Sequence, residues 1–196
     1  MEYTISKTKR LIIILCSSFL ILHVLITRLL LFIDTPTKTE TYEQLIQNII
    51  YLIPLGYLLL EFYNYFRHYK FKVLQISILI ILIMEIILRS TPFPNPLEST
   101  WQKAVLLSAS TIWIASSVVL IAVLLKNKTE VHPGMFSIRN YAITSLLIYM
   151  FATTYRFYLK PVNPITTLLI VGLTSAIPFI FTIVFATKLN LKELNN

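Results

Sequence analysis

The chain has 196 residues, of which 56% are hydrophobic and 13% are charged, and its mean hydropathy is +0.74. Soluble domains carry about 25% charged residues, so this composition excludes an ordinary soluble globular protein. The net charge is +8, but the basic residues are scattered without a recognition fold, and no direct nucleic-acid binding is expected. We therefore expect an all-α polytopic membrane protein.

The first apolar stretch is predicted to be a retained helix rather than a signal peptide. The segment "KTKRLIIILCSSFLILHVLITRLLLFI" begins with basic residues, as a signal peptide does. Its apolar run is too long for the hydrophobic region of a signal, and no small-residue cleavage site follows it. Cys16 is the only cysteine, which excludes an intramolecular disulfide and a multi-cysteine metal site.

Six apolar stretches predict a bundle of six transmembrane helices that forms a single integral membrane domain. About 20 apolar residues in a helix cross the hydrocarbon core. Charged, polar or Pro-rich breaks separate the stretches, and these breaks are short, so consecutive helices should lie side by side and antiparallel. The predicted helices cover residues 11–33, 44–62, 73–90, 101–125, 140–158 and 165–187.

The basic residues predict the orientation. Most of the 17 Lys and Arg residues fall in segments that six helices would place on one side of the membrane. Because cytoplasmic segments are enriched in Lys and Arg, both termini are predicted to be cytoplasmic and the protein to lie in the plasma (inner) membrane. These residues also favour contact with anionic membrane lipids. The aromatic residues from Tyr51 to Tyr69 are assigned to an interfacial belt at the inner end of the second helix.

Ionisable residues inside the predicted helices are the main candidates for a site, because charges in lipid are costly and mark function. At a rise of 1.5 Å per residue, four of them lie about 18–25 Å from the cytoplasmic ends of their helices: Arg28, Glu85, Arg89 and Arg156. If their helices share an interior, these side chains form an outward-facing anion site. The alternatives are arginines that extend separately to the outer headgroups while Arg89 neutralises Glu85, or a proton or ion pathway.

The second helix carries polar and helix-breaking residues inside its apolar run, "QNIIYLIPLGYLLLEFY". Pro54 removes a backbone donor and favours a kink. Gly56 permits another backbone to come near, and the Asn48 amide is placed to hydrogen-bond across helices. We predict a bent helix whose polar outer half faces the level of Glu85.

Other residues point to packing rather than to chemistry. The three histidines are scattered, so no metal ion or other cofactor is expected, and the sequence lacks a Gly-rich phosphate loop and a GxSxG elbow. Small residues in the fourth and sixth helices suit close packing, either within the chain or between protomers: Ala104, Ser108, Ala115, Ser116, Ala122, Gly172 and Ala176.

The second and third helices resemble those of the VanZ-like membrane proteins. "NIIYLIPLG" is similar to the signature of their second helix, in which an Asn precedes an aromatic-rich apolar run ending in Pro-x-Gly; Asn48, Pro54 and Gly56 match it. "ILIMEIILR" resembles the family's Glu-bearing helix, with Glu85 as that Glu. The resemblance covers about residues 44–90; the family's following Gln, Arg-Asp-rich stretch and Asn-Thr-x-Gly helix are missing. It implies an outward-facing role at the cell envelope, where VanZ-like proteins are associated with glycopeptide antibiotic resistance.

The favoured function is a small non-enzymatic bacterial membrane protein that binds an anionic envelope lipid or an antibiotic at the outer Arg/Glu cluster. One alternative is an accessory or effector protein of a prokaryotic defence system, for example a CRISPR-associated one. Such a protein would oligomerise through helices four and six, meet a cytoplasmic protein partner and perturb the membrane. A second alternative is a small transporter or an intramembrane enzyme: a Glu-x-x-x-Arg pair is one element of the CAAX-protease family, but only His23 lies in a helix at matching depth.

Overall fold

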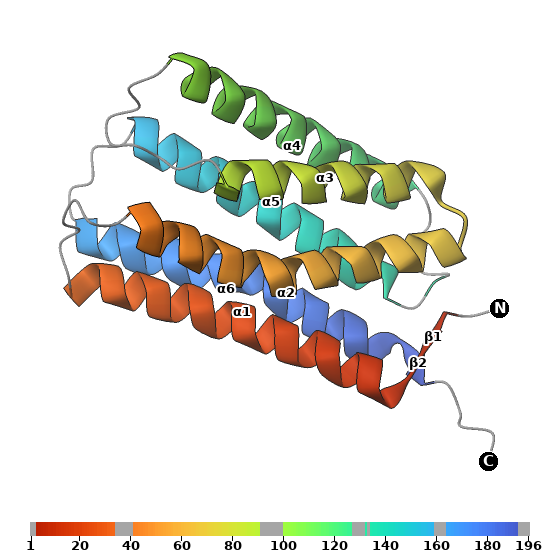
Figure 1. Ribbon diagram of the computed structural model, residues 1–196. Helices are drawn as coiled ribbons and strands as arrows, with labels where there is room; N and C mark the ends of the chain where they lie inside the picture. Colours follow the sequence, from red (N-terminus) through yellow and green to blue (C-terminus); the bar gives the residue numbers. More distant parts are fainter. Residues whose placement is uncertain are drawn as a thin grey trace. The chain divides into compact units, whose positions relative to one another are not determined.

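The computed structural model describes residues 3–33, 41–90, 100–126, 132, 134–158 and 164–191 (Figure 1). Within these residues the chain is helical apart from two short strands, β1 (Thr4–Ile5) and β2 (Asn190–Leu191). A helix is present in each of the six predicted ranges, which confirms the all-α class. The helices are α1 (Lys7–Ile33), α2 (Thr41–His68), α3 (Lys72–Ser90), α4 (Thr100–Lys126), α5 (Met135–Tyr158) and α6 (Pro164–Lys188).

The membrane character of the fold lies in the length and apolarity of its helices. Among the described residues, four helical segments are long and apolar enough to cross a membrane: Lys7–Thr27, Leu45–His68, Lys72–Ser90 and Thr100–Lys126. A further apolar helical segment, Leu173–Lys188, is shorter. The chain is thus of the membrane type, while the full set of six spans stays a prediction.

The chain divides into two compact units. The terminal unit comprises Met1–Thr35 and Leu124–Asn196, and the central unit comprises Pro36–Val123. In the terminal unit α6 packs against both α1 and α5. Strands β1 and β2 pair in parallel, with Thr4 opposite Asn190, and so join the beginning of α1 to the end of α6 (Figure 1). Helices α1 and α6 are therefore antiparallel.

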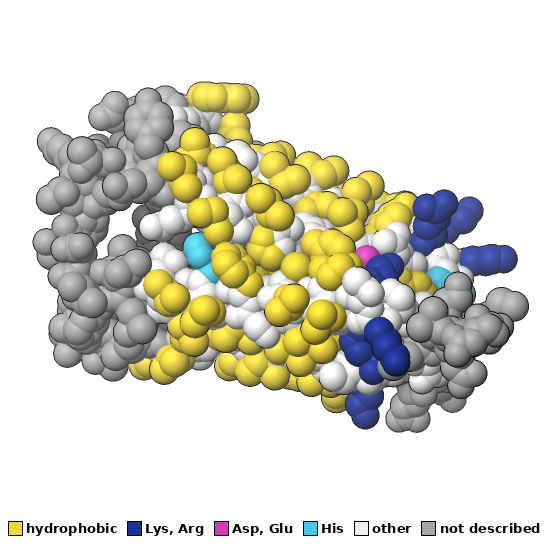
Figure 2. All heavy atoms as spheres, turned by 60° about the horizontal axis from the view of Figure 1, so that its bottom comes forward, with side chains coloured by type: hydrophobic (Ala, Val, Ile, Leu, Met, Phe, Trp, Pro, Cys, Tyr) yellow, Lys and Arg dark blue, Asp and Glu magenta, His cyan; other side chains and the backbone are white. Residues whose placement is uncertain are grey.

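Helix α1 has one apolar face toward α6 and another toward the surroundings. Ile13, Ser17 and Leu20 are buried at helical spacing. The exposed face repeats every three or four residues, which places its members on one stripe: Leu11, Leu15, Phe19, Leu22 and Ile26. Figure 2 shows such hydrophobic side chains on the surface, with Lys and Arg side chains gathered where α1 begins. In water this stripe would be unfavourable, whereas lipid tails accommodate it.

Helix α5 begins at Met135, earlier than the predicted residue 140, because a glycine turn starts it. Gly134 has a φ of 89°, which only glycine adopts without strain. Its carbonyl accepts hydrogen bonds from the amides of Ser137 and Ile138. The same glycine lies against Phe185 of α6, so the beginning of α5 is held close to the end of α6.

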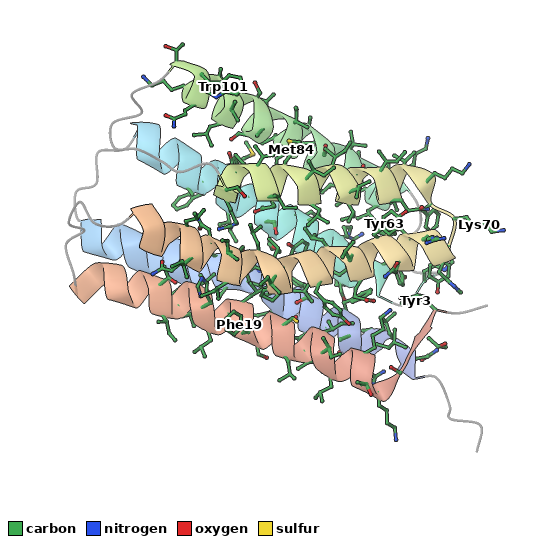
Figure 3. The ribbon with its side chains drawn as sticks, viewed as in Figure 1. Tyr3, Phe19, Tyr63, Lys70, Met84 and Trp101 are labelled. Atoms are coloured by element: carbon green, nitrogen blue, oxygen red, sulfur yellow. The ribbon has the colours of Figure 1, made fainter. Side chains whose placement is uncertain are left out.

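The central unit contains an antiparallel hairpin of α2 and α3. Helix α2 continues to His68, beyond its predicted end at residue 62, and stops where Lys70 adopts a φ of 60° (Figure 3). Phe71 N donates to Phe66 O, and Lys70 N donates to Arg67 O, at 3.0 and 3.1 Å. This pair of bonds is the Schellman arrangement that satisfies the last carbonyls of a helix. The aromatic run after residue 62 thus continues the helix rather than ending it.

Four of the five small residues predicted for packing in α4 are exposed. Ala104, Ser108, Ala115 and Ala122 are exposed, whereas Ser116 is buried together with Trp113. In α6, Ala176 is buried within the chain, and the surroundings of Gly172 lie outside the described residues. Ala176 of α6 and Ser116 of α4 therefore contribute to packing inside the chain, whereas the four exposed residues of α4 do not.

Candidate functional site

The register of the α2–α3 hairpin brings the predicted polar residues of both helices to one end. At the turn, Phe66 pairs with Phe71. Midway along the hairpin, Gly56 lies beside Leu82, and at the far end Asn48 meets Arg89. These pairs share one antiparallel register. Because α3 rises about 1.5 Å per residue, the far end lies about 25 Å from the basic turn at Lys70 and Lys72.

Glu85 continues the face of α3 that packs against its neighbours. Leu74, Ile78 and Ile81 are buried along this face, and the same spacing leads to Glu85 and then, one turn later, to Arg89. Arg89 Nε donates to Glu85 Oε2 at 3.0 Å. The side chains are 17% exposed for Glu85 and 32% exposed for Arg89, so the carboxylate is sheltered and the guanidinium reaches the surface. The predicted pairing of these residues is confirmed.

Helix α2 fixes Arg89 from the other side. The guanidinium carbon of Arg89 lies 3.8 Å from the centre of the Tyr51 ring, a close cation–π contact. Asn48, one turn before Tyr51, donates its amide Nδ2 to the carbonyl oxygen of Arg89 at 3.0 Å. Helix α3 ends at Ser90, and the last four carbonyls of a helix lie beyond its regular i to i+4 bonding. The predicted cross-helix bond of Asn48 is thus a cap on α3.

Together, Asn48, Tyr51, Glu85 and Arg89 form the α2–α3 cluster. The guanidinium is held by a carboxylate at Nε and by an aromatic ring on its face, and its backbone is fixed by an amide. Such a group is preorganised to receive an anion, because little side-chain freedom is lost when a ligand binds. The charges of Glu85 and Arg89 cancel, so the cluster as a whole is neutral.

Two of the predicted site residues come from the terminal unit. Arg28 lies in α1 and Arg156 in α5, but both side chains lie outside the described residues. Their predicted meeting with Glu85 and Arg89 therefore stays a prediction. Asn48, Glu85 and Arg89 do come together, within the central unit alone.

The predicted kink residues lie inside a continuous helix. Pro54 is buried within α2, which extends on both sides of it, and a kink at this position stays a prediction. A Cβ atom built on Gly56 would lie 3.8 Å from Leu82 Cδ1, an ordinary contact. The described neighbours of Gly56 are therefore not so close that they require glycine.

Two features were missed in the sequence. Tyr51 is predicted to lie in the inner aromatic belt, and this prediction is wrong: the ring stacks on Arg89, at the opposite end of the hairpin from Lys70. A count of one helical turn from Asn48 would have placed both residues on the same face. Glu61 is not singled out by the sequence, yet it is buried within α2, with an exposed fraction of 5%. The burial of Glu61 could have been expected if "FYNYFRH" after it is read as a continuation of the helix.

Metal binding and similarity to known proteins give no further assignment. In the part of the chain that the structure describes, no three His, Cys, Asp or Glu residues are grouped so that they can hold a metal ion. Comparison with protein-family profiles, with curated proteins and with solved structures gives no match to this chain. The functional interpretation therefore rests on the geometry of the α2–α3 cluster.

Proposed function

We propose that this protein is a small non-enzymatic integral membrane protein that binds the phosphate group of an envelope lipid at the α2–α3 cluster. One observation carries the proposal: the Arg89 guanidinium is bound at Nε by Glu85 and stacked on Tyr51, yet the Arg89 side chain stays 32% exposed. A guanidinium that is both oriented and accessible can contact a ligand without first being ordered.

The chemistry of arginine favours phosphate as the ligand. Its planar fork donates paired hydrogen bonds to phosphate oxygens, and these charge-assisted bonds are stronger than neutral ones. A lipid phosphate lies at the edge of the hydrocarbon core, where Arg89, near the end of a membrane-type helix, can reach it. Glu85 and Tyr51 act as positioning residues in this proposal, since both hold Arg89.

The proposal includes the topology with six spans and cytoplasmic termini. Lys70 and Lys72 at the α2–α3 turn favour the cytoplasmic side, and the opposite end of the hairpin then reaches the outer leaflet. The resemblance of residues 44–90 to VanZ-like proteins supports an envelope role, whereas the antibiotic, effector and transporter alternatives stay predictions because no described contact bears on them.

The direct test is lipid binding by purified protein. The chain in detergent is titrated with a phosphatidylglycerol and with a diacylglycerol of the same acyl chains, and bound lipid is counted by native mass spectrometry. The intact protein should prefer the phospholipid by about tenfold, and Arg89→Gln should remove most of that preference. Arg89→Lys should retain only part of it, because an ammonium lacks the planar fork.

A matched control separates the site from general loss of charge. Arg67→Gln removes one exposed cation from the same hairpin at its opposite end and should leave the preference unchanged. Circular dichroism and thermal unfolding establish that both variants are folded. Equal phospholipid preference in the intact protein, Arg67→Gln and folded Arg89→Gln would contradict the proposal.

A further inference from the structure

The Glu85 carboxylate has one oxygen that accepts no hydrogen bond from the described residues. Oε2 accepts the bond from Arg89 Nε; within the described parts of the chain, Oε1 receives no hydrogen bond. A carboxylate has about four acceptor positions on its two oxygens. In a sheltered position at the edge of a membrane, an incompletely bonded carboxylate is costly. Oε1 can therefore accept a bond from a donor other than the described residues.

We infer that the α2–α3 cluster recognises a zwitterionic headgroup that carries a phosphate and a primary ammonium, as in phosphatidylethanolamine, with Arg89 on the phosphate and Glu85 Oε1 on the ammonium. This inference rests on the proposed function and specifies its ligand. The acidic and basic groups of the cluster are adjacent on one helix, with Arg89 Nε and Glu85 Oε2 3.0 Å apart. The two charges of the headgroup are likewise close together, separated by two carbon atoms.

Charge balance separates this ligand from an anionic lipid. Glu85 and Arg89 sum to zero, so a headgroup with one negative and one positive charge leaves the bound site neutral. A phosphatidylglycerol would add a negative charge beside Glu85 with no ammonium to offset it. The phosphate and the Glu85 carboxylate would then repel each other, because both are negative. A phosphatidylcholine has the right net charge, but its trimethylammonium has no N–H group and cannot donate to Glu85.

The experiment compares three lipids of identical acyl chains on the purified full chain by native mass spectrometry. Phosphatidylethanolamine should bind about five- to tenfold more tightly than phosphatidylcholine or phosphatidylglycerol. Glu85→Gln retains an oxygen that can accept from Arg89 Nε but removes the charge, and it should abolish the advantage over phosphatidylcholine. The exposed control Arg67→Gln should leave that advantage intact.

Soluble glycerophosphoethanolamine, added as a competitor, shows whether the acyl chains contribute: strong competition assigns the recognition to the headgroup alone, and weak competition assigns it to the whole lipid.

The outcomes distinguish this inference from the proposed function. If all three phospholipids bind equally but Arg89→Gln weakens them all, the phosphate site stands and the zwitterionic assignment is wrong. The same conclusion follows if a folded Glu85→Gln variant keeps the full preference for phosphatidylethanolamine. If Arg89→Gln changes the binding of none of them, both proposals fail.

Discussion

Ser17 in α1 and Thr182 in α6 share a hydrogen bond of 2.5 Å between side chains that are completely buried. Each hydroxyl also lies 2.7 Å from a carbonyl of its own helix, that of Ile13 or of Phe179. Since a hydroxyl carries one proton, one of the two hydroxyls donates to the other across the helices. The hydroxyl that accepts this bond donates its own proton to the carbonyl of its own helix. This buried polar contact fixes the register of the antiparallel α1–α6 pair.

We predict that Ser17 and Thr182 are energetically coupled. Ser17→Ala and Thr182→Val should each lower the free energy of unfolding by about 1 kcal/mol, and the double variant should lose less than the sum. Interhelical bonds of this kind in membranes contribute about 0.6 kcal/mol and at most about 1.7. Reversible unfolding in mixed micelles measures all four proteins, with Ser108→Ala on the exposed face of α4 as the control. Strictly additive losses would mean that the contact contributes nothing.

Two glycines should respond in opposite ways to the same substitution. Gly134→Ala places a Cβ 2.8 Å from Phe185 Cδ2 at a φ of 89°, so steric overlap and backbone strain should together lower stability by about 2 kcal/mol or more. Gly56→Ala adds a methyl group 3.8 Å from Leu82 inside a helix and should raise stability by about 0.5–1 kcal/mol. Thermal unfolding of the two variants gives each sign directly: a loss in Gly56→Ala would contradict the assignment at Gly56, and an unchanged or raised stability in Gly134→Ala would contradict the one at Gly134.

The turn between α2 and α3 contains a residue, Lys70, whose replacement by glycine should raise stability. Lys70 adopts a φ of 60°, which costs a residue with a Cβ atom about 1 kcal/mol relative to glycine. Lys70→Gly should therefore stabilise the protein by about this amount, and Lys70→Val should destabilise it further. Lys70→Gln removes the charge without changing the backbone preference and serves as the control. A gain in Lys70→Gln as large as in Lys70→Gly would assign the effect to charge.

The sequence predicted the helices well because long apolar runs leave few alternatives in a membrane. The spacing of Glu85 and Arg89 also predicted their pairing, since residues four apart on a helix are neighbours. Helix ends were harder: α2 continues through "YNYFRH" because Lys70 can adopt the conformation that a Schellman arrangement needs. Polarity alone does not reveal such an end.

The residues of the α2–α3 cluster were predicted only in part, because their contacts depend on how the two helices pack. Asn48 and Arg89 are 41 positions apart, and only the register of the hairpin brings them together. Tyr51 shows the limit: in the sequence it is one of many aromatic residues near the membrane surface, and only packing identifies it as the partner of Arg89. Likewise, neither Ser17 nor Thr182 indicates its partner, because small hydroxyl residues are common throughout such helices.

Asn48 should stabilise the far end of the hairpin. Its amide is the cap on the carbonyl of Arg89 at 3.0 Å, and Asn48→Ala leaves that carbonyl without this donor. We expect a loss of about 0.5–1.5 kcal/mol in the free energy of unfolding. Faster hydrogen exchange should be confined to the last turn of α3. Gln47→Ala, at the neighbouring exposed position, is the control and should change neither measurement.

Any association between protomers should involve α4 rather than α6. The exposed small residues of α4, Ser108 and Ala115 among them, leave room for a second helix to come close, whereas Ala176 of α6 is already buried in the chain. Ala115→Leu should then reduce dimer formation by about tenfold without changing unfolding of the protomer, because a larger side chain separates the backbones. Energy transfer between labelled protomers in vesicles measures this, and Leu15→Ala, on the exposed stripe of α1, is the control. If Ala115→Leu and Leu15→Ala both associate like the unchanged chain, the exposed small residues of α4 face only lipid.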